Sequence, residues 1–160
     1  MEPRIDLMTN ALGASIAKRI YSVAQVIEKS SLPKATQDLV MLRASQINGC
    51  GWCVDVHTKE AAAAGETAAR LHLVAAWRHA SVFTDAERAA LALAEEGTRL
   101  ADGRGVSDEV WAEVRKHHDD EQIIALVALV AMINANNRLS VILNYQGGAY
   151  QPGMFTALAS

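Results

Sequence analysis

The residues best suited to chemistry in this 160-residue chain lie in one short stretch. Its two cysteines, Cys50 and Cys53, are three residues apart, and His57 follows four residues later. Positions i, i+3 and i+7 share one face of a helix, so a helix from Cys50 onward would align both sulfurs with the imidazole. The alanine-rich run that follows favours this helix, because alanine has the highest helix propensity. The sequence therefore predicts a helix over residues 50–64, with Gly65 ending it.

The position of the pair within that helix matters for its reactivity. Asn48 and Gly49 are typical of a junction between two helices, since glycine suits the left-handed C′ position and Asn or Gly suits an N-cap. Unpaired N–H groups and the positive end of the helix dipole stabilise a thiolate there. A free cysteine, with a pKa near ~8.5, is only a few per cent ionised at neutral pH. Lowering that pKa by one unit requires about 1.4 kcal/mol, which the dipole and His57 can supply together.

Three interpretations of the cysteine pair remain open at this point: a redox dithiol, half of a zinc site, or two inert packing residues. A tetrahedral zinc site takes four ligands, and Cys50, Cys53 and His57 supply three, with Asp38 or His72 as a fourth. A thioredoxin motif would follow a strand in a βαβ unit, and no strand is indicated. A disulfide needs Cα atoms within about 7 Å, which one helical turn provides.

The pattern Asp38-x11-Cys50-x2-Cys53-x3-His57, with Ser-Gln-Ile-Asn-Gly leading into Cys50, resembles the alkylhydroperoxidase D-type core of the carboxymuconolactone decarboxylase-like superfamily. The resemblance continues through residues 76–78, 87–94 and 133–138, and so covers most of the chain. It implies that Cys53 attacks a peroxide or a disulfide substrate and that Cys50 resolves the product as an intramolecular disulfide. His57 and Asp38 would move the proton.

The resemblance also implies no cofactor, an external dithiol reductant or a peroxiredoxin partner, and a homotrimer or homohexamer. One residue departs from the family pattern, which usually has Glu where this chain has Asp38. The shorter side chain moves the carboxylate by roughly 1.5 Å, a gap that a water can bridge. Relatives without the cysteine pair perform a decarboxylation, so the fold does not determine the chemistry. The alternatives are a decarboxylase-type activity and a non-catalytic oligomeric or zinc-binding module.

Length and composition narrow the class of protein. A chain of 160 residues suits a single domain, 1–160, with a substantial core. The net charge of −3 argues against a nucleic-acid partner, which would call for a basic patch. The N-terminus lacks the features of a signal peptide. The apolar run 123–133 is shorter than the roughly 20 residues of a membrane span. We therefore expect a cytoplasmic protein without a membrane partner, where a cysteine pair is more often redox-active or metal-binding than structural.

An all-α, multi-helix bundle is predicted, because prolines are few, aromatics make up 5% and alanine is abundant. The expected helices are 8–28, 33–47, 50–64, 66–79, 85–100, a short helix capped by Ser107, and 119–145. Thr84 to Glu87 form a capping box. The run 123–133 is apolar on all sides and is expected to be buried all round.

Further predictions concern packing. Asn134, Asn137 and Arg138 interrupt the longest helix, and such groups must be hydrogen-bonded, so we expect a structural role at helix ends or a subunit interface. Trp52 is expected to pack rather than to react. The amphipathic segment 8–28, the run 123–133 and the segment 141–143 carry more apolar surface than a small monomer usually exposes, which predicts an oligomer.

Overall fold

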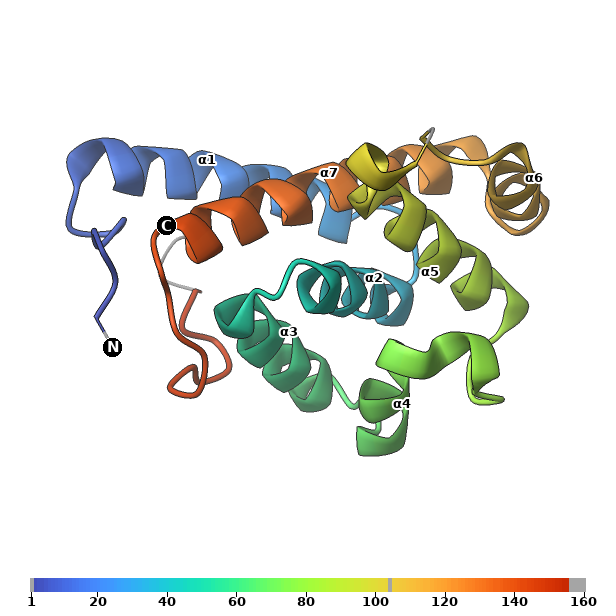
Figure 1. Ribbon diagram of the computed structural model, residues 1–160, viewed down its shortest axis with the longest axis horizontal. Coiled ribbons are helices and arrows are strands. Elements are labelled where there is room, and N and C mark those ends of the chain that lie inside the picture. Colours follow the sequence, from blue (N-terminus) through green and yellow to red (C-terminus); the bar gives the residue numbers. More distant parts are fainter. Residues whose placement is uncertain (1, 104, 156–160) are drawn as a thin grey trace.

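The computed structural model describes residues 2–103 and 105–155, and within them every regular element is helical (Figure 1). The all-α prediction is therefore confirmed. The elements in chain order are α1 (Ala11–Glu28), α2 (Lys34–Ile47), α3 (Gly51–Ala63), α4 (Ala68–Leu73), the 3-10 helix η1 (Val74–His79), α5 (Asp85–Thr98), the 3-10 helix η2 (Leu100–Asp102), α6 (Asp108–His117) and α7 (Asp120–Ile142).

Helix α2 is the central element, because it packs against α3 on one side and against α5 and α7 on others (Figure 1). Its apolar side chains therefore enter two clusters. Val40 joins a cluster with side chains of α5, α6 and α7, whereas Leu39 and Leu42 join one with α3, α4, η1 and α5. Burial of each such side chain stabilises the fold by about 1.5–3 kcal/mol. Because α2 is held on several faces, its C-terminal end gives the following turn, and with it Cys50, a rigid support.

The predicted helix ends agree well with the structure where local capping decides them. Thr84 and Glu87 form the expected capping box at the start of α5, and Ser107 caps α6. Asn48 is the C-cap of α2, and Gly49 follows it with φ of 65°, the left-handed conformation that glycine adopts without steric cost. These ends depend on contacts within a few residues, which explains why the sequence predicts them.

The predicted single helix over residues 66–79 is wrong. The chain forms α4 and then η1, with non-helical backbone at Ala76 (φ −120°, ψ 27°). The Arg88 guanidinium donates hydrogen bonds of 3.0 Å to the carbonyls of Trp77, Arg78 and Ala80, which satisfies carbonyls at the end of η1 and in the connection after it. In η1, Val74 and Trp77 are buried, and Ala75 between them is exposed.

The prediction that residues 123–133 are buried all round is also wrong. Ile123, Leu126 and Val130 face the core, but Ile124 is 70% exposed and Val127 47% exposed. Helix α1 runs alongside α7 but leaves part of its outer face open (Figure 1). As a 23-residue helix, α7 is long and apolar enough to cross a membrane by length and composition alone, which the shorter run did not indicate. A core helix of a water-soluble protein passes the same test, and one face of α7 lines the core.

Candidate active site

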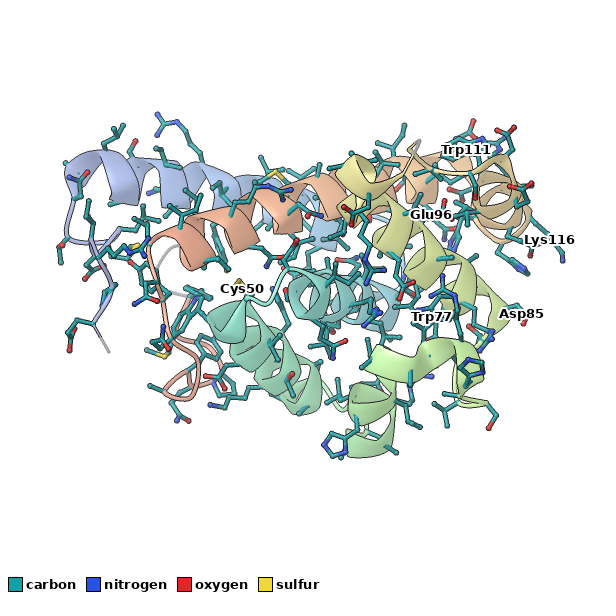
Figure 2. The ribbon with its side chains drawn as sticks, viewed as in Figure 1. Cys50, Trp77, Asp85, Glu96, Trp111 and Lys116 are labelled. Atoms are coloured by element: carbon teal, nitrogen blue, oxygen red, sulfur yellow. A yellow bond between two sulfur atoms is a disulfide. The ribbon has the colours of Figure 1, made fainter. Side chains whose placement is uncertain are left out.

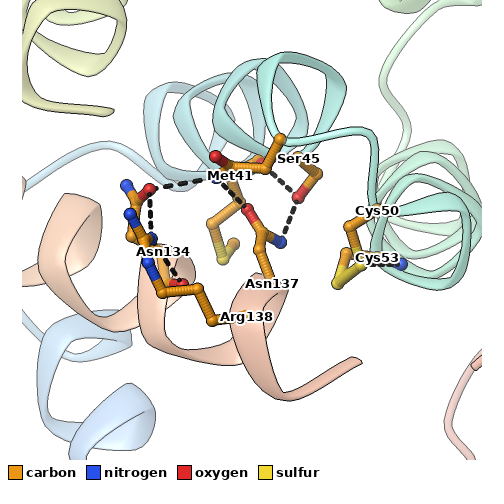
Figure 3. Close-up of a disulfide and its surroundings, with 8 residues drawn as sticks. Met41, Ser45, Cys50, Cys53, Asn134, Asn137 and Arg138 are labelled. Carbon is orange, nitrogen blue, oxygen red and sulfur yellow. Dashed lines mark hydrogen bonds between the residues drawn. A yellow bond between two sulfur atoms is a disulfide. The ribbon is translucent and has the colours of Figure 1, made fainter. Parts of the chain in front are cut away.

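Cys50 and Cys53 form a disulfide at the N-terminal end of α3, with their Cα atoms 5.3 Å apart (Figures 2 and 3). Cys50 is the N-cap of the helix, and its Sγ accepts a hydrogen bond of 3.2 Å from the backbone N–H of Cys53. That N–H is one of the donors left unpaired at a helix start. Both side chains are buried, at 1% and 4% exposure. The predicted placement of the pair at a helix N-terminus is confirmed.

A buried amide network fixes the turn that leads into Cys50 (Figure 3). Asn48 Nδ2 donates to Oδ1 of Asn134 (2.9 Å) and of Asn137 (2.8 Å). Asn137 Nδ2 donates to Ser45 Oγ (3.1 Å), and the Ser45 carbonyl in turn accepts the N–H of Cys50 (3.0 Å). The amides of α7 thus hold the C-terminal end of α2 and the start of α3 together. This confirms that the amides that interrupt α7 are structural groups bonded to a neighbouring helix end.

The same network continues away from the cysteines. Asn134 Nδ2 donates to Thr98 Oγ1 (3.0 Å) on α5, and Arg138 Nη1 donates to Asn134 Oδ1 (3.0 Å). Each buried amide of α7 therefore has partners for its oxygen and its nitrogen, as buried polar groups require. Three helices, α2, α5 and α7, are joined at the level of the Cys50 turn.

His57 lies on α3, one turn after Cys53, and its imidazole makes no hydrogen bond to the described residues. Its ring keeps a little surface exposure but is surrounded by protein atoms. This desolvation is the main reason why the pKa of His57 is lowered to about 4, and the positive charge of Lys34 lowers it further. The charge of Glu60 opposes both effects. At neutral pH the imidazole is therefore uncharged.

Asp38 lies on α2 and is almost fully buried. Its Oδ1 forms an ion pair with Lys34 Nζ, one helical turn earlier on the same helix. Burial raises the pKa of Asp38, and the hydrogen bond and charge of Lys34 oppose that rise. In the part of the chain described by the structure, Asp38 bonds neither His57 nor a cysteine. Sequence reasoning missed Lys34, although the i, i+4 spacing of a lysine and an aspartate was a usable signal.

The C-terminal strap, residues 144–155, lies along α3 next to the cysteines (Figure 1). Asp55 Oδ2 accepts the backbone N–H groups of Gly148 (2.7 Å) and Tyr150 (3.1 Å). Lys59 Nζ donates to the carbonyl of Tyr150 (2.9 Å), and Glu60 accepts the Tyr150 hydroxyl. The segment that the sequence indicated as a loop or tail is therefore anchored by three charged side chains of the cysteine helix.

Trp52, between the two cysteines, packs against aromatic rings of this strap. Its ring centroid lies 5.7 Å from that of Tyr150 and 6.1 Å from that of Tyr145, close enough for aromatic contact. The backbone of Gly147 approaches so closely that a Cβ added there would lie 2.4 Å from the carbonyl oxygen of Gly51. The expected packing role of Trp52 is confirmed, and its partners come from a segment almost a hundred residues later.

The site holds no metal-binding cluster among the described residues, and it lies apart from an open cavity of the molecule. Among the described residues, no three His, Cys, Asp or Glu side chains converge as a metal ion would require. An open cavity of ≈790 Å³ lies elsewhere, where Glu95, Arg99 and Ser107 contribute to its lining. The candidate residues do not line it, so the chemistry indicated by the sequence and this cavity belong to different parts of the molecule.

Comparison with known proteins establishes the family. Residues 16–96 match the sequence model of the Carboxymuconolactone decarboxylase family. The chain belongs to this family. The uncharacterised family relative YdfG of Bacillus subtilis is 37% identical over 124 residues, which cover 78% of this chain and 84% of YdfG.

Solved structures agree on the fold. A protein of unknown function from Agrobacterium tumefaciens, suggested to be the antioxidant defence protein AhpD, is 30% identical with a TM-score of 0.85, over 93% of this chain and all of the other. The debrominase Bmp8 is 20% identical with a TM-score of 0.76, over 89% of this chain and 76% of its own, and this shows a shared fold alone. The alkylhydroperoxidase D-type core predicted from the sequence is confirmed.

Proposed function

We propose that this protein is a thiol-dependent peroxidase or disulfide reductase whose Cys50–Cys53 pair cycles between dithiol and disulfide. The observation that carries the proposal is the bridged pair at the N-terminus of α3, one turn from a neutral His57. Membership of a family with alkylhydroperoxidase D-type structures supports the same chemistry.

The peroxide reaction begins with the thiolate of Cys53, which attacks one peroxide oxygen. The O–O bond breaks, Cys53 becomes a sulfenic acid, and the departing alkoxide takes a proton to leave as an alcohol. Cys50 then attacks the Cys53 sulfur, a disulfide forms, and hydroxide leaves as water after taking the proton of the Cys50 thiol. An external dithiol reduces the disulfide and is itself oxidised, whereas an oxidised peroxiredoxin partner would be a disulfide substrate that the Cys50–Cys53 dithiol reduces. A disulfide substrate follows the same route through a mixed disulfide in place of the sulfenic acid.

The surroundings of the pair support rapid closure of this cycle. The sulfurs are adjacent, so a sulfenic acid on Cys53 meets Cys50 before a second peroxide oxidises it further. An imidazole that is neutral at rest does not retain the proton it receives, so His57 can pass the proton of Cys53 to the leaving group. Asp38 would serve as a proton acceptor behind it.

A thiol count tests the proposal directly. We expect two free thiols in the reduced protein and none after stoichiometric peroxide, with no crosslinked dimer on a non-reducing gel. Cys53→Ser should abolish turnover with an external dithiol, and His57→Ala should slow it strongly. His72→Ala is the matched control, because His72 is exposed on α4. A Cys53→Ser variant that still consumes peroxide at the wild-type rate refutes the mechanism, and one stoichiometric zinc per chain in the same sample favours the zinc-binding alternative.

A decarboxylase-type activity is the second candidate, favoured by the family match over residues 16–96. The cysteine pair argues against it, because the chemistry proposed above uses both sulfurs. A variant with Cys50→Ser and Cys53→Ser separates the two, since a decarboxylase would retain release of CO₂ without its thiols.

The protein acts in the cytoplasm as a homotrimer or a homohexamer under this proposal. The apolar outer faces of α1 and α7 support self-association, with Leu12 and Val26 on α1 and Ile124 on α7 all at least 70% exposed. A second copy of the chain would cover them.

A further inference from the structure

We propose that Lys34 is a positioning residue of the candidate site, which holds the Asp38 carboxylate and keeps an ammonium charge close to His57. The inference rests on the proton relay proposed above and adds to it a residue that the sequence pattern did not contain. Lys34 is not a catalytic residue in this proposal, because it acts through Asp38 and His57 rather than on a sulfur.

Lys34 occupies an unfavourable position for a cation in α2. It is the first residue of the helix, directly after Pro33, where the positive end of the helix dipole disfavours a cation. Helices α5, α6 and α7 carry acidic residues in their first turns, whereas α1 to α4 carry none, and α2 begins with a lysine. The helix dipole therefore does not account for a lysine at this position.

The ion pair compensates the burial of Asp38. The Asp38 side chain is 5% exposed, and a carboxylate so deeply buried is costly without a partner. Lys34, whose side chain is 44% exposed, reaches over one helical turn to bond it while its charge stays at the surface. The pair engages Oδ1 of the carboxylate and leaves Oδ2 without a hydrogen bond to the described residues.

The charge of Lys34 acts on Asp38 and His57 at once. Around Asp38, Glu28 from α1 and Glu66 after α3 are negative and favour the protonated acid, and Lys34 is the charge that opposes them. Around His57, Glu60 favours the imidazolium, and Lys34 opposes it. Loss of the lysine would therefore move both groups toward their protonated forms.

The proton relay requires both groups to be unprotonated. An imidazolium at His57 cannot accept the proton of the Cys53 thiol, and a protonated Asp38 cannot accept one from His57. Lys34 thus lowers the pH below which the two relay groups become protonated.

The test follows the His57 ring by NMR during pH titration of the oxidised protein, with the resonance assigned through its loss in His57→Gln. We expect Lys34→Met to move the titration midpoint of His57 upward by about 0.5 pH unit or more, since one nearby charge is lost. Lys34→Arg, which keeps the charge, should restore the wild-type midpoint. Lys29→Met is the matched control, because it removes an exposed lysine at the end of α1. A shift in Lys34→Met no larger than in Lys29→Met overturns the proposal, as does Lys34→Arg behaving like Lys34→Met.

A kinetic measurement separates this inference from the function it rests on. The rate of thiol oxidation by peroxide is recorded against pH. In Lys34→Met, the acidic limb of this pH–rate profile should move to higher pH by the same amount as the NMR midpoint. The NMR experiment needs no turnover. An NMR shift in a protein that does not react with peroxide refutes the peroxidase and leaves the role of Lys34 established, whereas an unchanged midpoint in an active enzyme refutes Lys34 alone.

Discussion

Replacing Asn137 by alanine should loosen the support of the Cys50 turn, and the structure allows its cost to be worked out. Asn137 is completely buried, accepts a hydrogen bond from Asn48 and donates one to Ser45. Each bond contributes about 1 kcal/mol. Asn48 keeps its bond to Asn134, and Ser45 Oγ keeps its bond to the Met41 carbonyl, so neither partner is left unpaired.

The net effect follows from these terms. Two lost bonds and the small cavity left by truncation cost about 2–3 kcal/mol, and the better helix propensity of alanine returns about 0.5 kcal/mol. We therefore expect the free energy of unfolding to fall by about 2 kcal/mol. For a chain of this size that corresponds to a decrease in Tm of about 4–8 °C. The disulfide should still form, because its two cysteines are only three residues apart.

Urea denaturation of the oxidised protein, followed by far-UV circular dichroism at one fixed protein concentration, measures this change. Asn136→Ala is the matched control, since Asn136 is the adjacent asparagine of α7, half-buried and without a side-chain hydrogen bond to the described residues. This control gains the same helix propensity from alanine and loses no side-chain hydrogen bond, so it should not destabilise the protein. If the free energies of unfolding of Asn137→Ala and Asn136→Ala agree within about 0.5 kcal/mol, the amide network does not support the Cys50 turn.

Three further predictions concern acid stability, the strap and assembly. Burial raises the pKa of Glu95, but hydrogen bonds from Arg78, Trp77 and Arg43 outweigh it and leave the pKa lowered. The stabilisation from Glu95 is therefore present above about pH 4.5 and is lost as the pH falls through the folded-state pKa. In Glu95→Gln, the free energy of unfolding from urea denaturation should depend less on pH between about pH 3 and 7. Gly147→Ala should detach the C-terminal strap, because the added Cβ meets the Gly51 carbonyl, and limited proteolysis within residues 144–155 should then be faster. Gly103→Ala is the control and should match wild type, because a Cβ there meets nothing within 4 Å. Light scattering should give a mass several times that of one 17.2 kDa chain, and a single-chain mass that persists on concentration contradicts the oligomer.

Much of the fold could be predicted from the sequence because local interactions decide it. The starts of α5 and α6 follow from the side chains of Thr84 and Ser107, which bond N–H groups within the same turn. The break before α3 follows from Gly49, which adopts its left-handed conformation without steric cost. The proximity of Cys50 and Cys53 likewise depends on one helical turn. These features would be the same in many tertiary structures, so they follow from the local sequence alone.

Only the tertiary structure decided which groups surround the candidate residues. The kink at Ala76 depends on Arg88, a residue of another helix, and the exposure of Ile124 depends on how far α1 covers α7. The aromatic contact of Trp52 with Tyr150 depends on the return of the chain to α3. Burial and electrostatic fields are properties of the packed molecule, because they sum over atoms that are distant in sequence. The sequence by itself therefore determined which residues are candidates for the chemistry, and the packing determined their protonation and their partners.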